Sequence, residues 1–265
     1  MSKQKQILDY NREAWNSQVA KGNQWTVPVT SKQVADAKKG NWNIVLTPVT
    51  PVPRDWFPDF STGACKVLCL AGGGGQQGPI LAAAGARVTV FDNSDAQLQQ
   101  DIDVAKRDGL ELETIQGDMS DLSAFQENTF DLIFHPCSNC FVDDVRPVWQ
   151  EAFRVLKPGS NLLSGFTNPA RYLFDDDLLE AGEMKVCYKI PFSDLASISP
   201  ELKARYKAEN EPHCFGHTLE DQMGGQIDAG FAFTGFFEDA YEKDNDVLSQ
   251  HIDTFIATKA TKPVK

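Results

Sequence analysis

A glycine-rich segment from Ala71 to Gly78 suits a ligand-binding loop. It reads Ala-Gly-Gly-Gly-Gly-Gln-Gln-Gly and directly follows the apolar run Val67–Leu70. Glycine lets the backbone approach a ligand closely, and free N–H groups at the start of a following helix favour an anionic part of that ligand. Gly73, Gly75 and Gly78 also have the Gly-x-Gly-x-x-Gly spacing of dinucleotide-binding loops. A tight turn is the alternative, but consecutive glycines are entropically costly without a ligand or close contact.

Polar residues follow two later apolar runs, where a nucleotide-like cofactor would need partners. Asp92 lies 17 residues after Gly75, and a carboxylate there can accept hydrogen bonds from both hydroxyls of a ribose. Asp118 can accept a hydrogen bond from an adenine amino group, and Met119 can donate its backbone N–H to the ring. Helix capping is the alternative role for Asp118. The glycine loop and Asp92 alone fit both a nicotinamide dinucleotide and S-adenosylmethionine, and the later residues favour S-adenosylmethionine.

The segment from His135 to Cys140 is the candidate place for chemistry on a substrate. It reads His-Pro-Cys-Ser-Asn-Cys and follows the apolar run 132–134, at a strand end of the kind where open parallel sheets bind ligands. His135 is the candidate general base or substrate-orienting residue, and Asn139 is a candidate polar positioning residue. A structural histidine that closes the strand end is the alternative for His135.

A zinc site is a weaker alternative for the cysteines. Cys137 and Cys140 form a Cys-x-x-Cys pair, and His213, Cys214 and His217 form a second group. Zinc would require the two groups to meet in space, because neither has the paired spacing of structural zinc sites. We therefore interpret these residues as buried thiols and surface histidines, and we expect no metal.

Short apolar runs alternate with helical patterns from Lys66 onward, which is typical of an α/β fold. The predicted strands are residues 67–70, 88–91, 112–115, 132–134, 162–166, 231–238 and 252–257. The predicted helices are residues 76–84, 95–107, 144–156 and 218–229. Near-continuous apolar strands with helical crossovers indicate a parallel sheet covered on both faces, and the last two strands are expected to pair antiparallel. Gly224 and Gly225 inside the last helix indicate close packing against the sheet.

The other parts of the chain differ from this core in composition. Residues 1–60 are interpreted as an N-terminal cap with a helix over 3–20 and a proline-rich extended segment over 42–60. Residues 61–167 are the cofactor-binding core, 168–216 an irregular lid-like insertion, and 217–265 the final helix and strand pair. The cap tryptophans are interpreted as packing residues, with a substrate-facing role for one of them as the alternative. They are Trp15, Trp25, Trp42 and Trp56.

Length and charge exclude several classes of protein. The 265 residues contain 25 Lys and Arg against 37 Asp and Glu, so the formal net charge is −12, which disfavours a surface that follows nucleic-acid phosphates. Hydrophobic residues make up 42% and charged residues 23%, as in folded globular proteins. No apolar stretch approaches the roughly 18 residues of a membrane helix, and six cysteines are too few for a disulfide scaffold. We expect a cytoplasmic protein without nucleic-acid or membrane partners.

Five sequence elements occur in the order found in one enzyme family. They are the glycine loop, Asp92, Gly117-Asp118-Met119, the run Phe130–Phe134 and the segment Glu151–Gly159. Together they resemble the class I S-adenosylmethionine-dependent methyltransferases, strongly over residues 61–167 and loosely over 217–258. The resemblance implies a doubly wound, Rossmann-like α/β fold with a seven-stranded, mostly parallel sheet and a terminal antiparallel strand pair. The independent strand predictions agree with this fold.

The same resemblance implies roles for individual residues. The methionine moiety of S-adenosyl-L-methionine would be held by the glycine loop, at Ala71, Gly72, Gly73 and Gly75. Asp92 would bind the ribose, and Asp118 and Met119 would bind the adenine. Asn93 would lie beside the adenosine, and His135 would lie beside the methyl group. Two departures from the family pattern concern the methionine end: Ala71 stands in place of the usual first glycine, and Cys69 in place of an acidic residue.

A small-molecule methyltransferase is therefore the leading prediction. Methyl transfer from a sulfonium needs mainly alignment of the acceptor and exclusion of water, with a general base where the acceptor is protonated. Two alternatives stay open: an NAD-dependent oxidoreductase, supported by the glycine spacing, and a non-catalytic sensor of an adenosyl ligand. The identity of the acceptor and the oligomeric state are not predicted.

Overall fold

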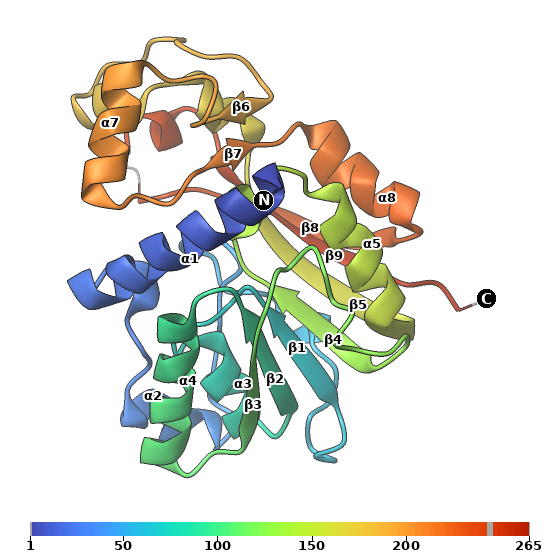
Figure 1. Cartoon of the computed structure of the whole chain (residues 1–265). Helices are drawn as coiled ribbons and strands as arrows, with labels where there is room; N and C mark the ends of the chain where they lie inside the picture. The colour runs from blue at the N-terminus through green and yellow to red at the C-terminus, as the bar shows by residue number, and fades with distance from the viewer. Residues whose placement is uncertain (1, 243–245, 265) are drawn as a thin grey trace.

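A seven-stranded sheet forms the centre of the computed structural model, which describes residues 2–242 and 246–264 (Figure 1). The strand order is β3-β2-β1-β4-β5-β9-β8. The strands are β1 (Lys66–Leu70), β2 (Arg87–Asp92), β3 (Leu112–Gln116), β4 (Phe130–His135), β5 (Leu156–Thr167), β8 (Ala232–Asp239) and β9 (Phe255–Thr261). The pairings from β3 to β5 are parallel, and β9 is antiparallel to both β5 and β8. The predicted Rossmann-like sheet with a terminal antiparallel pair is confirmed.

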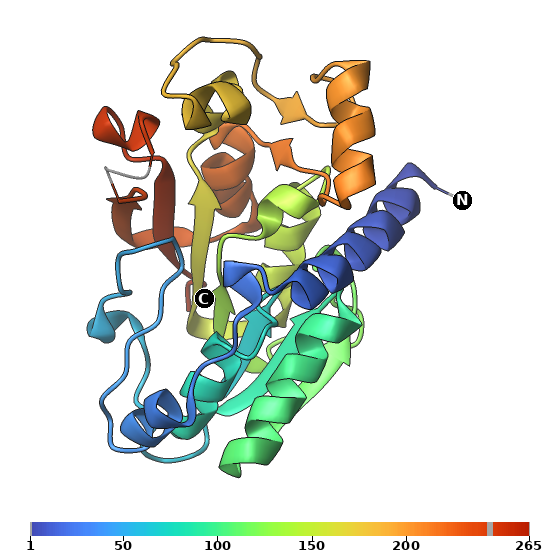
Figure 2. The ribbon, with the colours of Figure 1, turned by 90° about the vertical axis from the view of Figure 1, so that its left-hand side faces the viewer.

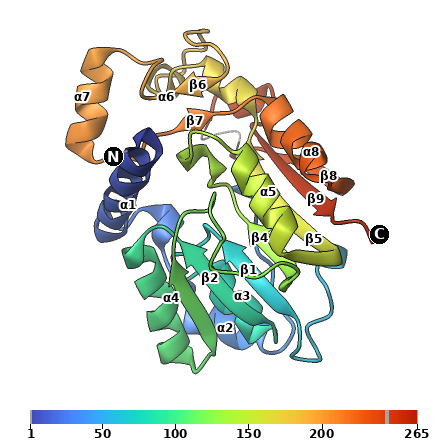
Figure 3. The same cartoon turned by 45° about the vertical axis from the view of Figure 1, so that its right-hand side comes forward.

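Helices and apolar segments cover both faces of the sheet. Side chains alternate between the two faces along each strand, so an apolar strand needs cover on both sides. Val67 and Cys69 of β1 pack in one core cluster with helix α3 (Gln77–Ala83) and the extended segment of the cap. Leu68 and Leu70 pack on the opposite face with helix α5 (Arg146–Val155). Figure 3 shows α5 in front of the sheet and α2 (Ser31–Ala37) behind it. The four side chains from Val67 to Leu70 are fully buried, which explains the continuous apolar run in the sequence.

The helical elements agree with the predicted core helices within a few residues. The α-helices are α1 (Lys3–Lys21), α2 (Ser31–Ala37), α3 (Gln77–Ala83), α4 (Asp95–Asp108), α5 (Arg146–Val155), α6 (Asp176–Glu180), α7 (Pro200–Glu209) and α8 (Gly225–Ala229). A π-helical turn, η5 (Glu220–Gly224), precedes α8. The 3₁₀ turns are η1 (Gln24–Thr26), η2 (Arg54–Trp56), η3 (Asn139–Phe141), η4 (Pro169–Leu173) and η6 (Leu248–Gln250). Among the described residues, no helix is long and apolar enough to cross a membrane.

One predicted boundary and one predicted packing contact need correction. β5 begins at Leu156, directly after α5, so residues 157–159 belong to a strand rather than to a helix-ending turn. In the ladder between β4 and β5, Phe130 pairs with Leu156 and Leu132 pairs with Asn161. The residues of β5 between these two pairs therefore form an irregularity. Gly225 packs against the Trp149 side chain of α5, where an added Cβ would lie 2.7 Å from the indole, and not against the sheet as predicted.

The N-terminal helix α1 lies between the sheet and the segment 168–216 (Figures 1 and 2). Asn16 accepts a hydrogen bond from the Ser94 hydroxyl at the start of α4. On the other side, Asn11 donates to the backbone oxygens of Phe141 and His213. Both Asn11 and Gln18 are buried, so polar side chains of α1 join the core to the segment above it.

The segment 168–216 is more regular than its sequence indicates. It contains η4, α6, α7 and the short antiparallel pair β6 (Phe192–Ser193) and β7 (Phe215–Gly216). Ser199 caps α7 and Pro200 begins it, but this helix buries none of its residues. A helix without an apolar face gives no periodic signal in a sequence, which explains why only an irregular lid was predicted.

Candidate functional site

A cavity of about 950 Å³ lies at the carboxyl ends of β1, β2, β3 and β4, beneath α1 and the segment 168–216. Open α/β sheets bind ligands at this edge, where the strand order reverses between β1 and β4. Seven of the residues predicted to bind the cofactor line the cavity together. They are Ala71, Gly72, Gly73, Asp92, Asn93, Asp118 and Met119.

Asp92 and the glycine loop form one hydrogen-bonded unit in the wall of this cavity. The backbone N–H of Gly73 donates to Asp92 Oδ2 at 3.0 Å, and the N–H of Ser94 donates to Oδ1 at 2.9 Å. Burial raises the pKa of Asp92, and these backbone donors partly offset that effect. A carboxylate that is fixed by N–H groups and still faces the cavity can accept hydrogen bonds from a vicinal diol, as in a ribose.

Gly75 is the one glycine of the predicted set that does not line the cavity, so the structure does not place it with the other predicted cofactor contacts. Its φ of +70° turns the backbone toward the cap, and an added Cβ would lie 3.0 Å from Pro28 and 3.1 Å from the Gln100 backbone oxygen. Ala71 adopts φ +48°, a left-handed conformation that glycine adopts more easily, at the position where the family usually has glycine.

Asp101 of α4 also holds the glycine loop, a role that the sequence did not reveal. Its side chain is fully buried, and Oδ2 accepts a hydrogen bond from the Gly74 N–H at 3.0 Å. Burial raises the pKa of Asp101 to about 7. Asp101 positions the loop without lining the cavity. Its place inside an ordinary helical pattern gave no signal for this role.

Asp118 and Asn93 form hydrogen bonds within the protein and also line the cavity. Asp118 Oδ1 accepts from the Ser120 N–H at 2.9 Å in a turn, and no helix begins there, so the helix-capping alternative is wrong. The Asn93 amide donates to the Leu8 backbone oxygen of α1 at 2.8 Å. Because both residues also line the cavity, local bonding fixes them beside the space for a ligand.

His135 does not occupy the predicted catalytic position. Its side chain is fully buried, Nδ1 bonds the Leu70 backbone oxygen at 2.8 Å, and the ring lies edge-on to Trp149 of α5. His135 is not among the residues that line the cavity, although the next residue, Pro136, is. The last side chain of β4 points to the α5 face of the sheet, a placement that fits the structural alternative and lies outside the cavity where a general base or cofactor contact was predicted.

The burial of His135 predicts a specific pH dependence of stability. Burial lowers the pKa of His135 to about 4 from 6.5, so between these values the unfolded chain binds more protons and stability falls as the pH falls. Relative to a His135→Phe variant, the wild-type unfolding free energy should therefore decrease by about 2 kcal/mol between pH 7.5 and pH 5. Urea unfolding of both proteins at the two pH values measures this difference. A constant difference would show that His135 is not held neutral by burial.

Asn139 is also structural. It is buried, and its amide exchanges two hydrogen bonds with Gln222 of η5, at 3.1 Å and 3.0 Å. Asn139 does not line the cavity, so the structure does not bring it to the place where the sequence predicted an acceptor-positioning residue. The sequence could not show that Gln222, 83 positions away, takes up this amide.

The cysteine and histidine groups meet only in part. The Cys140 side chain raises the pKa of the Cys214 thiol, so these two cysteines lie close together. The His213 ring instead stacks on Tyr10 at 4.0 Å between centroids, and His217 Nε2 bonds the Asn139 backbone oxygen. Within residues 2–242 and 246–264, no group of three or more potential metal ligands is arranged to hold an ion.

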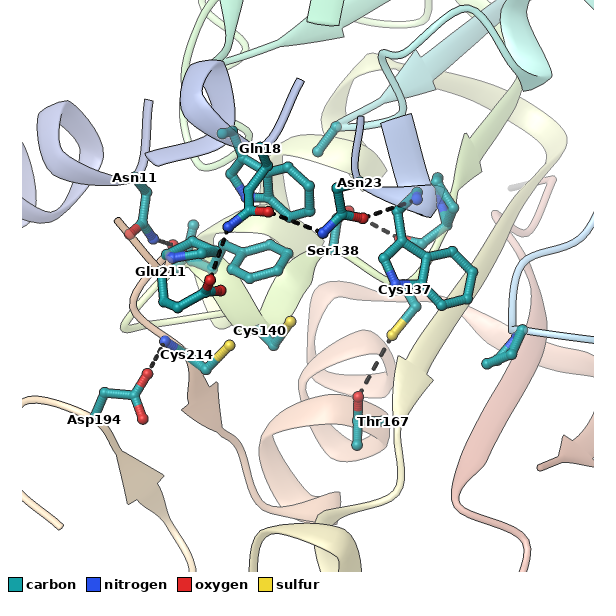
Figure 4. Close-up of a pocket in the computed structure, with 18 of the residues that line it drawn as sticks. Asn11, Gln18, Asn23, Cys137, Ser138, Cys140, Thr167, Asp194, Glu211 and Cys214 are labelled. Carbon is teal, nitrogen blue, oxygen red and sulfur yellow. Dashed lines mark hydrogen bonds between the residues drawn. The ribbon is translucent and has the colours of Figure 1, made fainter. Parts of the chain in front are cut away.

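The cavity continues from the sheet edge into the segment 168–216, where the sequence predicted no individual site residue. Figure 4 shows Asp194, Cys214 and Glu211 around this part, with Gln18 of α1 hydrogen-bonded to Glu211. Trp15 and Trp25 line the cavity, as the substrate-facing alternative allowed for one cap tryptophan. Trp42 and Trp56 pack instead on phenylalanines of the cap and of β8.

The donor set at the sheet edge fits an adenosyl ligand, and comparison with known proteins agrees. The family profile described as "Methyltransferase domain" matches residues 68–164. An "Uncharacterized methyltransferase YbaJ" of Bacillus subtilis (strain 168) is 51% identical over 256 residues, covering 97% of this chain and 98% of the relative. The chain belongs to the class I S-adenosylmethionine-dependent methyltransferases.

Solved structures show that this methyltransferase has the expected fold. A putative S-adenosylmethionine-dependent methyltransferase from Listeria monocytogenes superposes with a TM-score of 0.60 at 17% identity, covering 80% of this chain and 95% of that one. One from Methanosarcina mazei gives 0.57 at 20% identity, covering 82% and 99%. The family profile and the Bacillus subtilis relative, in addition, make the protein an enzyme with S-adenosylmethionine as its expected cofactor. The two alternatives from the sequence, an NAD-dependent oxidoreductase and a non-catalytic sensor, are therefore set aside.

Proposed function

We propose that this methyltransferase transfers the methyl group of S-adenosylmethionine to a small-molecule acceptor, with cap, core and lid acting as one unit. The observation that carries the proposal is the continuity of the cavity. The same space touches Gly72 and Asp92 at the sheet edge and Tyr172 and Asp194 of the lid. Its volume of about 950 Å³ is near the upper end of the range of about 300–1,000 Å³ for small-molecule sites.

The cofactor half of the cavity is assigned to the sheet edge. Asp92 accepts hydrogen bonds from the ribose hydroxyls, and Asp118 and Met119 border the adenine. Ala71, Gly72 and Gly73 pass beside the methionine moiety, with Asn93 next to the adenosine. The backbone bond from Gly73 to Asp92 keeps the loop and the carboxylate in register. When bound, the cofactor supplies a methyl group already activated on a sulfonium.

The chain itself then aligns the acceptor and excludes water. Trp15 of α1 lies edge-on to Phe141 with 5.0 Å between ring centroids, and both residues line the cavity. The Tyr10 hydroxyl donates to the Glu211 backbone oxygen, which ties α1 to the lid over the same space. A cavity partly covered by α1 and the lid, with a partly apolar lining, favours reaction with a small acceptor over water.

A partition experiment tests the class of acceptor. A cell extract is separated by ultrafiltration into small molecules and macromolecules, and each fraction is incubated with the enzyme and methyl-labelled S-adenosylmethionine. We expect transfer of label into the small-molecule fraction and formation of S-adenosylhomocysteine. The Asp92→Ala variant should lose most of this transfer. Label that enters only protein or nucleic acid would contradict the proposal.

A further inference from the structure

Asp194 is a buried carboxylate at the lid end of the cavity. Only 6% of the residue is exposed, and Oδ2 accepts a hydrogen bond from the Cys214 backbone N–H at 2.6 Å. The Asp194 N–H donates in turn to the Cys214 oxygen, so the end of the β6–β7 pair fixes the residue. Oδ1 has no hydrogen-bond partner within the part of the chain that the structure describes, and the residue lines the cavity (Figure 4).

The charges around Asp194 are unbalanced. Nine carboxylates but only two guanidinium groups, and no lysine, are found among the described residues that line the cavity. Arg171 is paired with Asp176 and Asp246, and Arg205 is paired with Asp177. Burial, with a smaller contribution from the Asp176 carboxylate, raises the pKa of Asp194 to about 6. A buried carboxylate without a cation beside it is costly, and a cationic ligand would remove that cost.

Aromatic side chains surround the same end of the cavity. Phe192, two residues before Asp194, stacks on Tyr172 with 5.5 Å between ring centroids, and Tyr188 packs on Phe192 at 5.2 Å. These three rings and Tyr206 line the cavity. Asp194 contributes to the raised pKa of Tyr206, which shows that the two side chains are near each other. Aromatic faces attract organic cations and also pack on apolar groups.

We propose that the acceptor carries an organic amine, bound as a cation by Asp194 Oδ1 with its apolar part against Phe192 and Tyr172. The ammonium anchors the acceptor and, having no lone pair, does not take the methyl group; another nucleophilic atom of the acceptor forms the bond to the methyl carbon as the bond to the cofactor sulfur breaks. This inference rests on the proposed function and adds the chemical class of the acceptor. A neutral molecule of the same shape would leave the Asp194 carboxylate without a partner, and an anion would be repelled by the surrounding carboxylates.

Calorimetric titration tests the proposal with three probes of matched shape: 2-phenylethylamine, 2-phenylethanol and 3-phenylpropionate. S-adenosylhomocysteine is first titrated alone, which tests the proposed function separately, and it is then kept saturating. The amine should bind about tenfold more tightly than the alcohol, or better, and the carboxylate should bind more weakly still. In Asp194→Asn, which keeps an acceptor for the Cys214 N–H, amine and alcohol should bind within about threefold of each other.

Asp177→Asn is the matched control, because it removes the same charge from the cavity lining at a residue that is paired with Arg205. It should keep the preference for the amine, and both variants should keep the wild-type affinity for S-adenosylhomocysteine. Equal binding of amine and alcohol by the wild type, binding of none of the probes, or an undiminished preference in Asp194→Asn would overturn the proposal. Failure of S-adenosylhomocysteine to bind would instead overturn the proposed function.

Discussion

Replacement of Asp92 by alanine is expected to weaken S-adenosylhomocysteine binding by about 10- to 150-fold. The carboxylate faces the cavity and accepts from the Gly73 N–H, so the substitution removes the acceptor for the ribose and loosens the loop beside the methionine moiety. A charge-assisted hydrogen bond contributes about 1.5–3 kcal/mol, which corresponds to this range. Isothermal titration calorimetry of the folded variant measures the change.

Two further variants make this result specific. Asp92→Asn keeps the shape and one acceptor oxygen, so it should fall between the wild type and Asp92→Ala. Asp103→Ala removes an exposed carboxylate of the following helix α4 and should leave the affinity unchanged. Wild-type affinity in a folded Asp92→Ala protein would mean that the ribose lies elsewhere.

Gly73→Val should reduce S-adenosylhomocysteine affinity by about 10- to 100-fold and also lower stability. An added Cβ at Gly73 would lie 2.8 Å from Gln97 Cβ and 3.2 Å from the Asp92 carboxyl carbon. The valine therefore forces the loop away from Asp92, and overpacking of this kind costs about 1–3 kcal/mol. Calorimetry and urea unfolding together separate the effect on binding from the effect on folding.

The matched control for this substitution is Gly224→Ala. Gly224 has only a flexible glutamate side chain near its added Cβ, at 3.7 Å, so the variant should fold and bind as the wild type does. Gly75→Val should mainly destabilise the fold, because Gly75 faces the cap and not the cavity. Undiminished affinity in Gly73→Val would contradict the assignment of the loop to the cofactor.

The sequence predicted the sheet and its ligand-binding edge well because continuous apolar strands and the glycine loop are local signals. It could not predict the direction of the side chain at the end of a strand. β4 is buried on both faces, so no polar alternation marks the face to which His135 points. Burial of the His135 ring against Trp149 depends on how α5 packs, which is a tertiary property.

The site residues of the segment 168–216 were even harder to predict from the sequence. Asp194 lies in an irregular segment, and its importance comes from Cys214, which is 20 positions away in the chain. Asp101 lies in a predicted helix, but only the folded structure brings it to Gly74. Residues that act through long-range contacts with backbone groups leave no spacing pattern that a single sequence can reveal.

A crystal structure of the wild-type enzyme with S-adenosylhomocysteine tests most directly whether the cavity at the sheet edge holds the cofactor. We expect both ribose hydroxyls within hydrogen-bonding distance of the Asp92 carboxylate, the adenine beside Asp118 and Met119, and the sulfur facing the lid end of the cavity. A ligand bound outside this cavity, or with its ribose away from Asp92, would show that these residues do not form the cofactor site.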